Sequence, residues 1–159
     1  MDQQTCVLIL GSMPGQKSLA ESQYYAHPRN AFWPIIENLF AIDREAPYRK
    51  RLQLLNASRV GLWDVFSRCY RPGSLDADIK KQDAEHNDFN GLFQRYPNIR
   101  YVFFNGKAAE QAFGKVVNMA DYPRIVFTGL PSTSPANASF SFAQKLAQWQ
   151  QIKAVLPDE

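Results

Sequence analysis

The fold is decided by two apolar runs that each lead into a loop of small residues. Val7-Leu8-Ile9-Leu10 is followed by Gly11-Ser12-Met13-Pro14-Gly15, and Arg124-Ile125-Val126-Phe127 is followed by Thr128-Gly129-Leu130-Pro131-Ser132-Thr133-Ser134-Pro135. Short apolar runs bounded by Gly and Pro are typical of buried strands. In open parallel sheets, sites form where the carboxyl ends of strands meet loops, and small residues there let a ligand approach the backbone. We therefore expect the functional site between these two loops.

Apolar periodicity elsewhere predicts an alternating order of strands and helices. We expect two further strands at 60–66 and 99–104, and helices at 30–40, 48–56, 89–96, 107–117 and 140–156. The last helix would have Ser139 as its cap and a buried stripe of Phe142, Leu146, Trp149, Ile152 and Leu156. Helical crossovers make strands parallel and place helices on both faces of the sheet. The sequence thus predicts one domain over residues 1–159, an α/β fold with a three-layer αβα sandwich around a four-stranded parallel sheet.

Composition narrows the class of protein. No stretch approaches the roughly 20 apolar residues of a membrane-spanning helix, and the polar start at residues 1–4 lacks the regions of a signal peptide, so we expect a cytoplasmic protein. Cys6 and Cys69 have no metal-ligand spacing, which predicts free thiols and no metal. The net charge of +3 is compatible with a polyanionic partner but does not require one.

The two loops exclude several common sites. The first loop has neither the Gly-x-x-x-x-Gly-Lys-Ser/Thr spacing of a phosphate loop nor the Gly-x-Gly-x-x-Gly spacing of a dinucleotide fold. Ser12 does not lie in a Gly-x-Ser-x-Gly elbow, which argues against a serine hydrolase. Strand ends at Gly11, Asp64, Asn105 and Leu130 should instead converge on one sheet edge. The segment 70–88 contains Pro72-Gly73-Ser74 and reads as a long functional or flexible loop with room for a short helix.

The first loop and the residues after it resemble a known motif. Gly11-Ser12-Met13-Pro14-Gly15, followed by Tyr25-Ala26-His27-Pro28-Arg29-Asn30-Ala31-Phe32-Trp33, is similar to the first motif of the uracil-DNA glycosylase superfamily, particularly its mismatch-specific uracil/thymine branch. In that branch an Asn at the place of Met13 positions the hydrolytic water, which a thioether cannot do. With Leu130-Pro131-Ser132-Thr133-Ser134-Pro135-Ala136-Asn137, the chain resembles the hypoxanthine-DNA glycosylase branch, family six.

The resemblance assigns roles to individual residues. It implies that Asn30, in Pro-Arg-Asn, is the catalytic residue; from its position Asn30 is also a helix cap, and the two roles can coexist. It implies that Tyr25, with Tyr24 as the alternative, stacks on an extruded base and that Asn105 reads the base edge, although Asn105 also suits an ordinary turn. The remaining implied substrate contacts are Gly11, Ser12, Met13 and His27, and the implied DNA contacts are Ser132, Thr133, Ser134, Ala136 and Asn137.

The function implied by the resemblance is a monofunctional DNA glycosylase of base excision repair. It would flip a deaminated base, hypoxanthine or also uracil, out of DNA, and water would cleave the N-glycosidic bond without metal or cofactor. We expect a monomer, associated with the nucleoid in a prokaryotic cell. Arg71 and Ser74 could meet phosphate, whereas Asp76 and Asp78 would brace their loop. Two alternatives stay open: a mismatch-specific uracil/thymine glycosylase, and a non-catalytic nucleic-acid-binding relative, suggested by Met13 and Leu130 at positions that are polar in the family.

Overall fold

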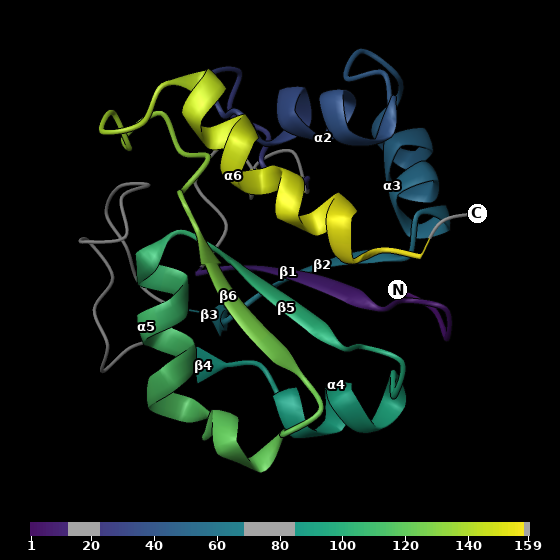
Figure 1. The fold of residues 1–159 in the computed structure, drawn as a ribbon, viewed down its shortest axis with the longest axis vertical. Helices are drawn as coiled ribbons and strands as arrows, with labels where there is room; N and C mark the ends of the chain where they lie inside the picture. Colours follow the sequence, from purple (N-terminus) through teal and green to yellow (C-terminus); the bar gives the residue numbers. More distant parts are fainter. Residues whose placement is uncertain (13–22, 69–84, 158–159) are drawn as a thin grey trace.

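The computed structural model describes residues 1–12, 23–68 and 85–157 (Figure 1). In this part of the chain four parallel strands form a sheet in the order β2-β1-β5-β6. The strands are β1 (Val7–Gly11), β2 (Val60–Asp64), β5 (Tyr101–Asn105) and β6 (Val126–Leu130). The helices are α2 (Phe32–Phe40), α3 (Tyr48–Ala57), α4 (Phe89–Arg95), α5 (Lys107–Val116) and α6 (Phe142–Val155), with a 3-10 turn, η3, at Met119–Asp121. The predicted α/β class and four-stranded parallel sheet are confirmed.

The sheet lies between two helical layers, because alternate side chains of its central strand point to opposite faces. Val7 and Ile9 of β1 pack with α2, α3 and α6, whereas Leu8 and Leu10 pack with α4 and α5. All four of these side chains are fully buried. Figure 1 shows α2, α3 and α6 on one side of the sheet and α4 and α5 on the other. A strand buried on both faces is expected to be apolar throughout, as the first run of the sequence is.

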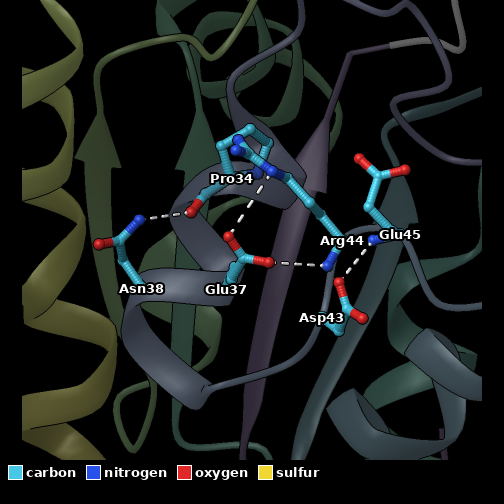
Figure 2. Close-up of polar contacts among 6 residues, drawn as sticks. All are labelled: Pro34, Glu37, Asn38, Asp43, Arg44 and Glu45. Carbon is cyan, nitrogen blue, oxygen red and sulfur yellow. Dashed lines mark hydrogen bonds and ion pairs between the residues drawn. The ribbon is translucent and has the colours of Figure 1, made fainter.

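The C-terminal end of α2 is fixed by local polar contacts (Figure 2). Ala41 adopts a left-handed conformation, with φ of 57°, and its amide bonds to the Glu37 carbonyl. The Glu37 side chain accepts from the Arg44 backbone amide at 3.0 Å and lies 3.6 Å from Arg44 Nε. Asn38 Nδ2 donates to the Pro34 carbonyl at 2.8 Å. The polar groups of this exposed turn therefore bond to one another, and the Arg44 side chain lies beside Glu37.

Most element boundaries differ from the sequence prediction by one or two residues; the strand expected at 60–66, for example, ends at Asp64. The changes in the last strand and the last helix matter for the second loop. The last strand covers Val126–Leu130 rather than 124–127, because Gly129 and Leu130 pair with the end of β5 and the ladder outweighs the turn-like composition. The last helix begins at Phe142, and its cap is Ser141, not Ser139. Ser141 and Gln144 form a reciprocal capping box. Phe142 is 44% exposed, so it does not belong to the buried stripe that we expected, whereas Trp149 and Ile152 do.

The expected long loop at 70–88 lies largely outside the described residues, as do Cys69, Arg71, Ser74, Asp76 and Asp78. At its margins, β3 (Phe66–Arg68) and β4 (Glu85–His86) form a two-stranded antiparallel sheet that the sequence did not predict. Cys6 is a free thiol, and burial raises its pKa. None of the helices in the described ranges combines the length and hydrophobicity needed to cross a bilayer.

A matched pair of substitutions tests the two-sided burial of β1. Val7→Ala removes two methyl groups from a fully buried position, whereas Val126→Ala removes the same groups from a 54% exposed position on the edge strand β6. We expect Val7→Ala to lower the free energy of unfolding by roughly 1.5–3 kcal/mol and Val126→Ala to change it by less than about 0.5 kcal/mol. Urea unfolding followed by circular dichroism measures both. Equal losses for the two variants would contradict this packing.

Candidate functional site

The carboxyl ends of all four sheet strands lie along one edge. Gly11 of β1 is paired with Asp64 of β2, and Asn105 of β5 is paired with Leu130 of β6. Leu10 and Phe104 link the two pairs through the central ladder between β1 and β5. The predicted convergence of the strand ends is therefore present. The loops that carry the two sequence motifs leave the sheet at this edge.

Because Gly11 has no side chain, the Asp64 carboxylate and the Tyr25 hydroxyl can lie close to the backbone at the end of β1. A Cβ atom at this position would be 2.6 Å from Asp64 Oδ1 and 3.2 Å from the Tyr25 hydroxyl. Gly11 and Ser12 are buried, and their carbonyls accept from the amides of Val65 and Phe66 at 2.8 and 2.9 Å. A carboxylate and a phenol can thus approach the end of β1 only because residue 11 has no side chain. The next motif residue, Met13, lies outside the described residues.

Tyr25 is held in an unusual backbone conformation at this edge. Its φ is 58°, in the left-handed region, which costs a non-glycine residue about 1 kcal/mol. Its ring stacks on the fully buried ring of Phe32, with centroids 4.1 Å apart and an interplanar angle of 29°. The neighbouring residue is fixed at both ends, since the Tyr24 amide donates to Tyr48 Oη and the Tyr24 carbonyl accepts from Trp33 Nε1, each at 3.0 Å. The surrounding contacts therefore impose the conformation that aims the Tyr25 ring.

Asp64 brings negative charge to this cluster of phenols. Asp64 is only 6% exposed. Burial and the Asp64 carboxylate raise the pKa of Tyr24 above its ordinary range, and burial raises the pKa of Tyr48. Both phenols consequently stay neutral at physiological pH and remain hydrogen-bond donors. The edge of the sheet near β2 therefore combines a buried carboxylate with neutral aromatic hydroxyls.

Asn30 lies immediately before α2. Its Oδ1 accepts from the Phe32 backbone amide, the first amide of α2, at 2.9 Å, although the residue at the N-cap itself is Ala31 rather than the expected Asn30. An amide N–H can face only the carbonyl oxygen of Asn30, which fixes the orientation of the side-chain amide. Within the described ranges Asn30 Nδ2 makes no hydrogen bond. The half-buried side chain thus keeps both N–H donors and one oxygen lone pair for a ligand.

His27 lies in the exposed turn before Asn30. Its Nδ1 accepts from the Arg29 amide at 3.1 Å, and its carbonyl accepts from the Asn30 amide at 2.9 Å. A ring nitrogen that accepts a hydrogen bond is unprotonated, so a neutral His27 carries its proton on Nε2. The structure gives His27 a role in shaping the turn that presents Asn30.

Asn105 uses both ends of its side chain to hold Thr133. Asn105 Nδ2 donates to the Thr133 hydroxyl, and Asn105 Oδ1 accepts from the Thr133 backbone amide, each at 2.9 Å. Thr133 is 1% exposed and Asn105 8% exposed. The hydroxyl of Thr133 therefore bonds inside the protein instead of lying on the surface where a DNA phosphate would contact it. Its carbonyl also accepts from the Ala31 amide at 3.0 Å.

The other residues of the second loop lie nearer the surface. Ser132 Oγ accepts from the Ser134 amide at 3.1 Å, and Ser134 Oγ accepts from the Ala136 amide at 3.2 Å. Asn137 Nδ2 donates to the Ser132 carbonyl at 3.2 Å. Ser132, Ser134 and Asn137 are half-buried and Ala136 is exposed. Because the two serine oxygens already accept from the backbone, each hydroxyl proton remains available to an acceptor such as phosphate.

Sequence reasoning missed three contributors to this edge. Asp64 was placed at a strand end but given no role. Lys145 and Trp149 of α6 hold the second loop from behind, with Lys145 Nζ bonded to the Ser134 carbonyl at 3.3 Å and Trp149 Nε1 bonded to the Pro131 carbonyl at 2.9 Å. A lysine at the spacing of the buried residues Trp149 and Ile152 was the available signal, since lysine is rarely buried without a reason.

Comparison with known proteins agrees with this arrangement. The model of the uracil DNA glycosylase superfamily matches residues 1–153. A protein of Methanosarcina acetivorans named hypoxanthine DNA glycosylase is 37% identical over 153 residues, which cover 96% of this chain and 92% of the relative. A protein of the same name from Methanosarcina barkeri is 43% identical over 108 residues, 67% of each chain.

A solved structure shares the fold. The solution NMR structure of a Methanosarcina acetivorans protein described as a uracil DNA glycosylase superposes with a TM-score of 0.78 at 34% sequence identity. The match covers 96% of this chain and 94% of that one. The family model, which spans residues 1–153, extends over the two motif segments that meet at the sheet edge. The chain therefore belongs to the uracil DNA glycosylase superfamily.

Proposed function

We propose that this protein is a monofunctional DNA glycosylase that removes hypoxanthine from deoxyinosine in DNA, with uracil as a second base. In this reaction the bond between C1′ of the sugar and the base breaks, and the electron pair leaves with the base. The oxygen of a water molecule bonds to C1′, and a proton of that water goes to the base or to solvent. The choice of hypoxanthine as the excised base rests on the names of the relatives, and the geometry of the sheet edge supports the hydrolytic chemistry.

One contact carries the proposal. The Ala31 amide donates to the Thr133 carbonyl at 3.0 Å and joins two motif segments that are far apart in the sequence. Asn105, at the end of β5, is bonded to the same Thr133. Asn30, Asn105 and the second loop are thereby gathered at one edge of the sheet. This is the arrangement that a flipped nucleotide needs, with a group for the sugar, a group for the base and a loop for the phosphates.

Asn30 is suited to hold the attacking water. Oδ1 has a second lone pair that can accept a water proton while the first accepts from Phe32. A hydrogen bond accepted from the water directs a lone pair of the water oxygen toward its target without adding charge. The developing positive charge on the sugar is the largest electrostatic demand of glycosidic cleavage, and preorganised groups meet it best in a site that excludes solvent.

Asn105 is suited to distinguish a deaminated purine from adenine. Because the Thr133 amide must face Oδ1, the Asn105 side chain cannot reverse its oxygen and nitrogen. Each atom has one further hydrogen-bonding position, an acceptor on Oδ1 and a donor on Nδ2. Hypoxanthine presents an N–H beside a carbonyl and matches this order, and so does uracil, whereas adenine presents an acceptor beside an amino group. The Tyr25 ring, which Phe32 supports by stacking, would stack on the base, a contact worth about 1–3 kcal/mol.

We further propose that the protein acts as a monomer in the cytoplasm. All the groups assigned above come from a single chain, and none requires a cofactor. The substrate DNA would be nucleoid-associated in a prokaryotic cell. Gel filtration with light scattering tests the monomer, since a dimer at micromolar concentration would contradict it.

Two substitutions separate the two roles of Asn30. Asn30→Ala removes the cap and the water acceptor, so we expect inosine excision to fall at least about 100-fold and stability to fall by about 1 kcal/mol. Asn30→Asp keeps an acceptor for both Phe32 and water, so excision should stay within about tenfold of the wild type. Single-turnover excision of inosine and thermal unfolding measure both effects.

Asn38→Ala is the matched control, because Asn38 lies on the exposed surface of the same helix and its side chain, among the residues that the structure describes, bonds only to the Pro34 carbonyl. This variant should excise inosine at the wild-type rate. If Asn30→Ala excises inosine as fast as Asn38→Ala, Asn30 does not act in catalysis.

A substrate panel tests the chemistry as a whole. Duplexes with a single inosine, uracil, mismatched thymine or adenine are incubated with the protein and then treated with alkali to cleave abasic sites. We expect cleavage at inosine fastest, slower cleavage at uracil and none at adenine. Borohydride should trap no protein–DNA adduct, because hydrolysis by water forms no Schiff base. Preferred cleavage of mismatched thymine would favour the mismatch-specific branch, and no cleavage of any duplex would favour a binding protein.

A further inference from the structure

Lys145 is a buried cation for which the proposed chemistry has no use. It lies in the first turn of α6 and is 6% exposed. Its Nζ donates to the Ser134 carbonyl at 3.3 Å, and no carboxylate of the described residues forms an ion pair with it. An ammonium group has three donors, so two have no partner among the described residues. Burial without a counter-charge is costly, and burial lowers the pKa of this lysine.

The position of Lys145 in its helix adds to that cost. The amino-terminal end of a helix carries partial positive charge, which disfavours a cation in the first turn. The fold would gain stability from an apolar or neutral residue here. An anion that binds near the ammonium would offset both the lost hydration and the unfavourable dipole.

The loop that Lys145 contacts at Ser134 offers donors rather than acceptors. The carbonyls of Pro131, Ser132, Thr133 and Ser134 all accept hydrogen bonds from within the protein. The hydroxyl protons of Ser132 and Ser134 remain available, as described above. Carbonyl oxygens would repel a phosphate, and here they are engaged, while hydroxyls and an ammonium attract it.

We propose that Lys145 supplies the positive charge of a DNA phosphate subsite that it forms with the hydroxyls of Ser132 and Ser134. The inference rests on the proposed function only in taking DNA as the ligand. It adds to that function a cation outside the loop, on α6. A bound phosphate would displace one counterion from DNA at this subsite, which makes the contact visible in the salt dependence of binding.

The main competing role is structural, since Lys145 also braces the Ser134 carbonyl. Lys145→Gln distinguishes the two roles because the Gln amide can still donate to that carbonyl but carries no charge. Lys145→Arg keeps the charge. Lys153→Gln is the matched control, since Lys153 is exposed in the last turn of the same helix. Thermal unfolding of each variant checks that the fold is intact.

Binding is measured by fluorescence anisotropy between 50 and 200 mM salt, with a duplex containing a tetrahydrofuran abasic-site analogue and with an undamaged duplex. For Lys145→Gln we expect the slope of log affinity against log salt to be less negative by about 0.9, so that over this range it loses about 3.5-fold less affinity than the wild type. The change should be the same for both duplexes. Lys145→Arg and Lys153→Gln should keep the wild-type slope.

If Lys145→Gln binds DNA more weakly than the wild type but with the same slope, Lys145 only braces the loop and the inference is overturned. Equal affinities of Lys145→Gln and the wild type would also overturn it. If Lys145→Gln does not fold, the slope of Lys145→Arg and the affinity of Ser132→Ala decide. A wild-type slope in Lys145→Arg with reduced affinity in Ser132→Ala supports the subsite, and any other combination overturns it. Inosine excision by the wild type is measured separately. If Lys145→Gln changes the slope as expected but the wild type does not excise inosine, the proposed function is overturned and this subsite stands.

Discussion

The backbone carbonyl of Thr133 accepts a hydrogen bond from the Ala31 amide, while the amide and hydroxyl of the same residue are bonded to Asn105. These contacts are almost completely buried, and each buried polar group left without its partner would cost about 1–3 kcal/mol. The second loop therefore cannot shift relative to α2 or β5 without losing several hydrogen bonds. The relative placement of the proposed water-holding, base-reading and phosphate-binding groups depends on this one residue.

The same edge also holds groups that are unfavourable for stability. Tyr25 has a left-handed backbone, Asp64 is a buried carboxylate and Lys145 is a buried ammonium. Strained or buried charged residues persist only where the surrounding structure fixes them, and they concentrate at functional sites. Here the surroundings are the two-sided core of β1 below and the aromatic contacts of Phe32 and Trp149 beside the loops.

The central strands could be predicted because burial on both faces of a parallel sheet requires continuous apolar runs such as Val7 to Leu10. The ends of β6 and α6 could not. Leu130 is in a strand because Asn105 lies beside it, and Ser141 rather than Ser139 caps α6 because Gln144 completes its capping box. Both outcomes depend on partners that are chosen only when the chain folds.

Site residues divide in the same way. The motif around Asn30 was visible in the sequence, and its capping bond followed from its position before a helix. The bonding of Thr133 to Asn105 was not visible, because both are polar residues after strands and either could have faced solvent. Lys145 lies in a helix whose periodicity drew attention to its apolar neighbours. Long-range hydrogen bonds leave no periodic pattern in a sequence, so the structure was needed to find them.

The most direct test is a crystal structure of the wild-type protein with a duplex that carries 2′-fluorodeoxyinosine, whose glycosidic bond resists hydrolysis. We expect an extruded hypoxanthine with its N–H and carbonyl facing Asn105, and a water molecule between Asn30 Oδ1 and C1′ of the sugar. Thr133 should keep its bonds to Asn105 and Ala31. A hypoxanthine that remains stacked in the duplex, or one that is extruded to a place away from Asn105 and Asn30, would contradict the account.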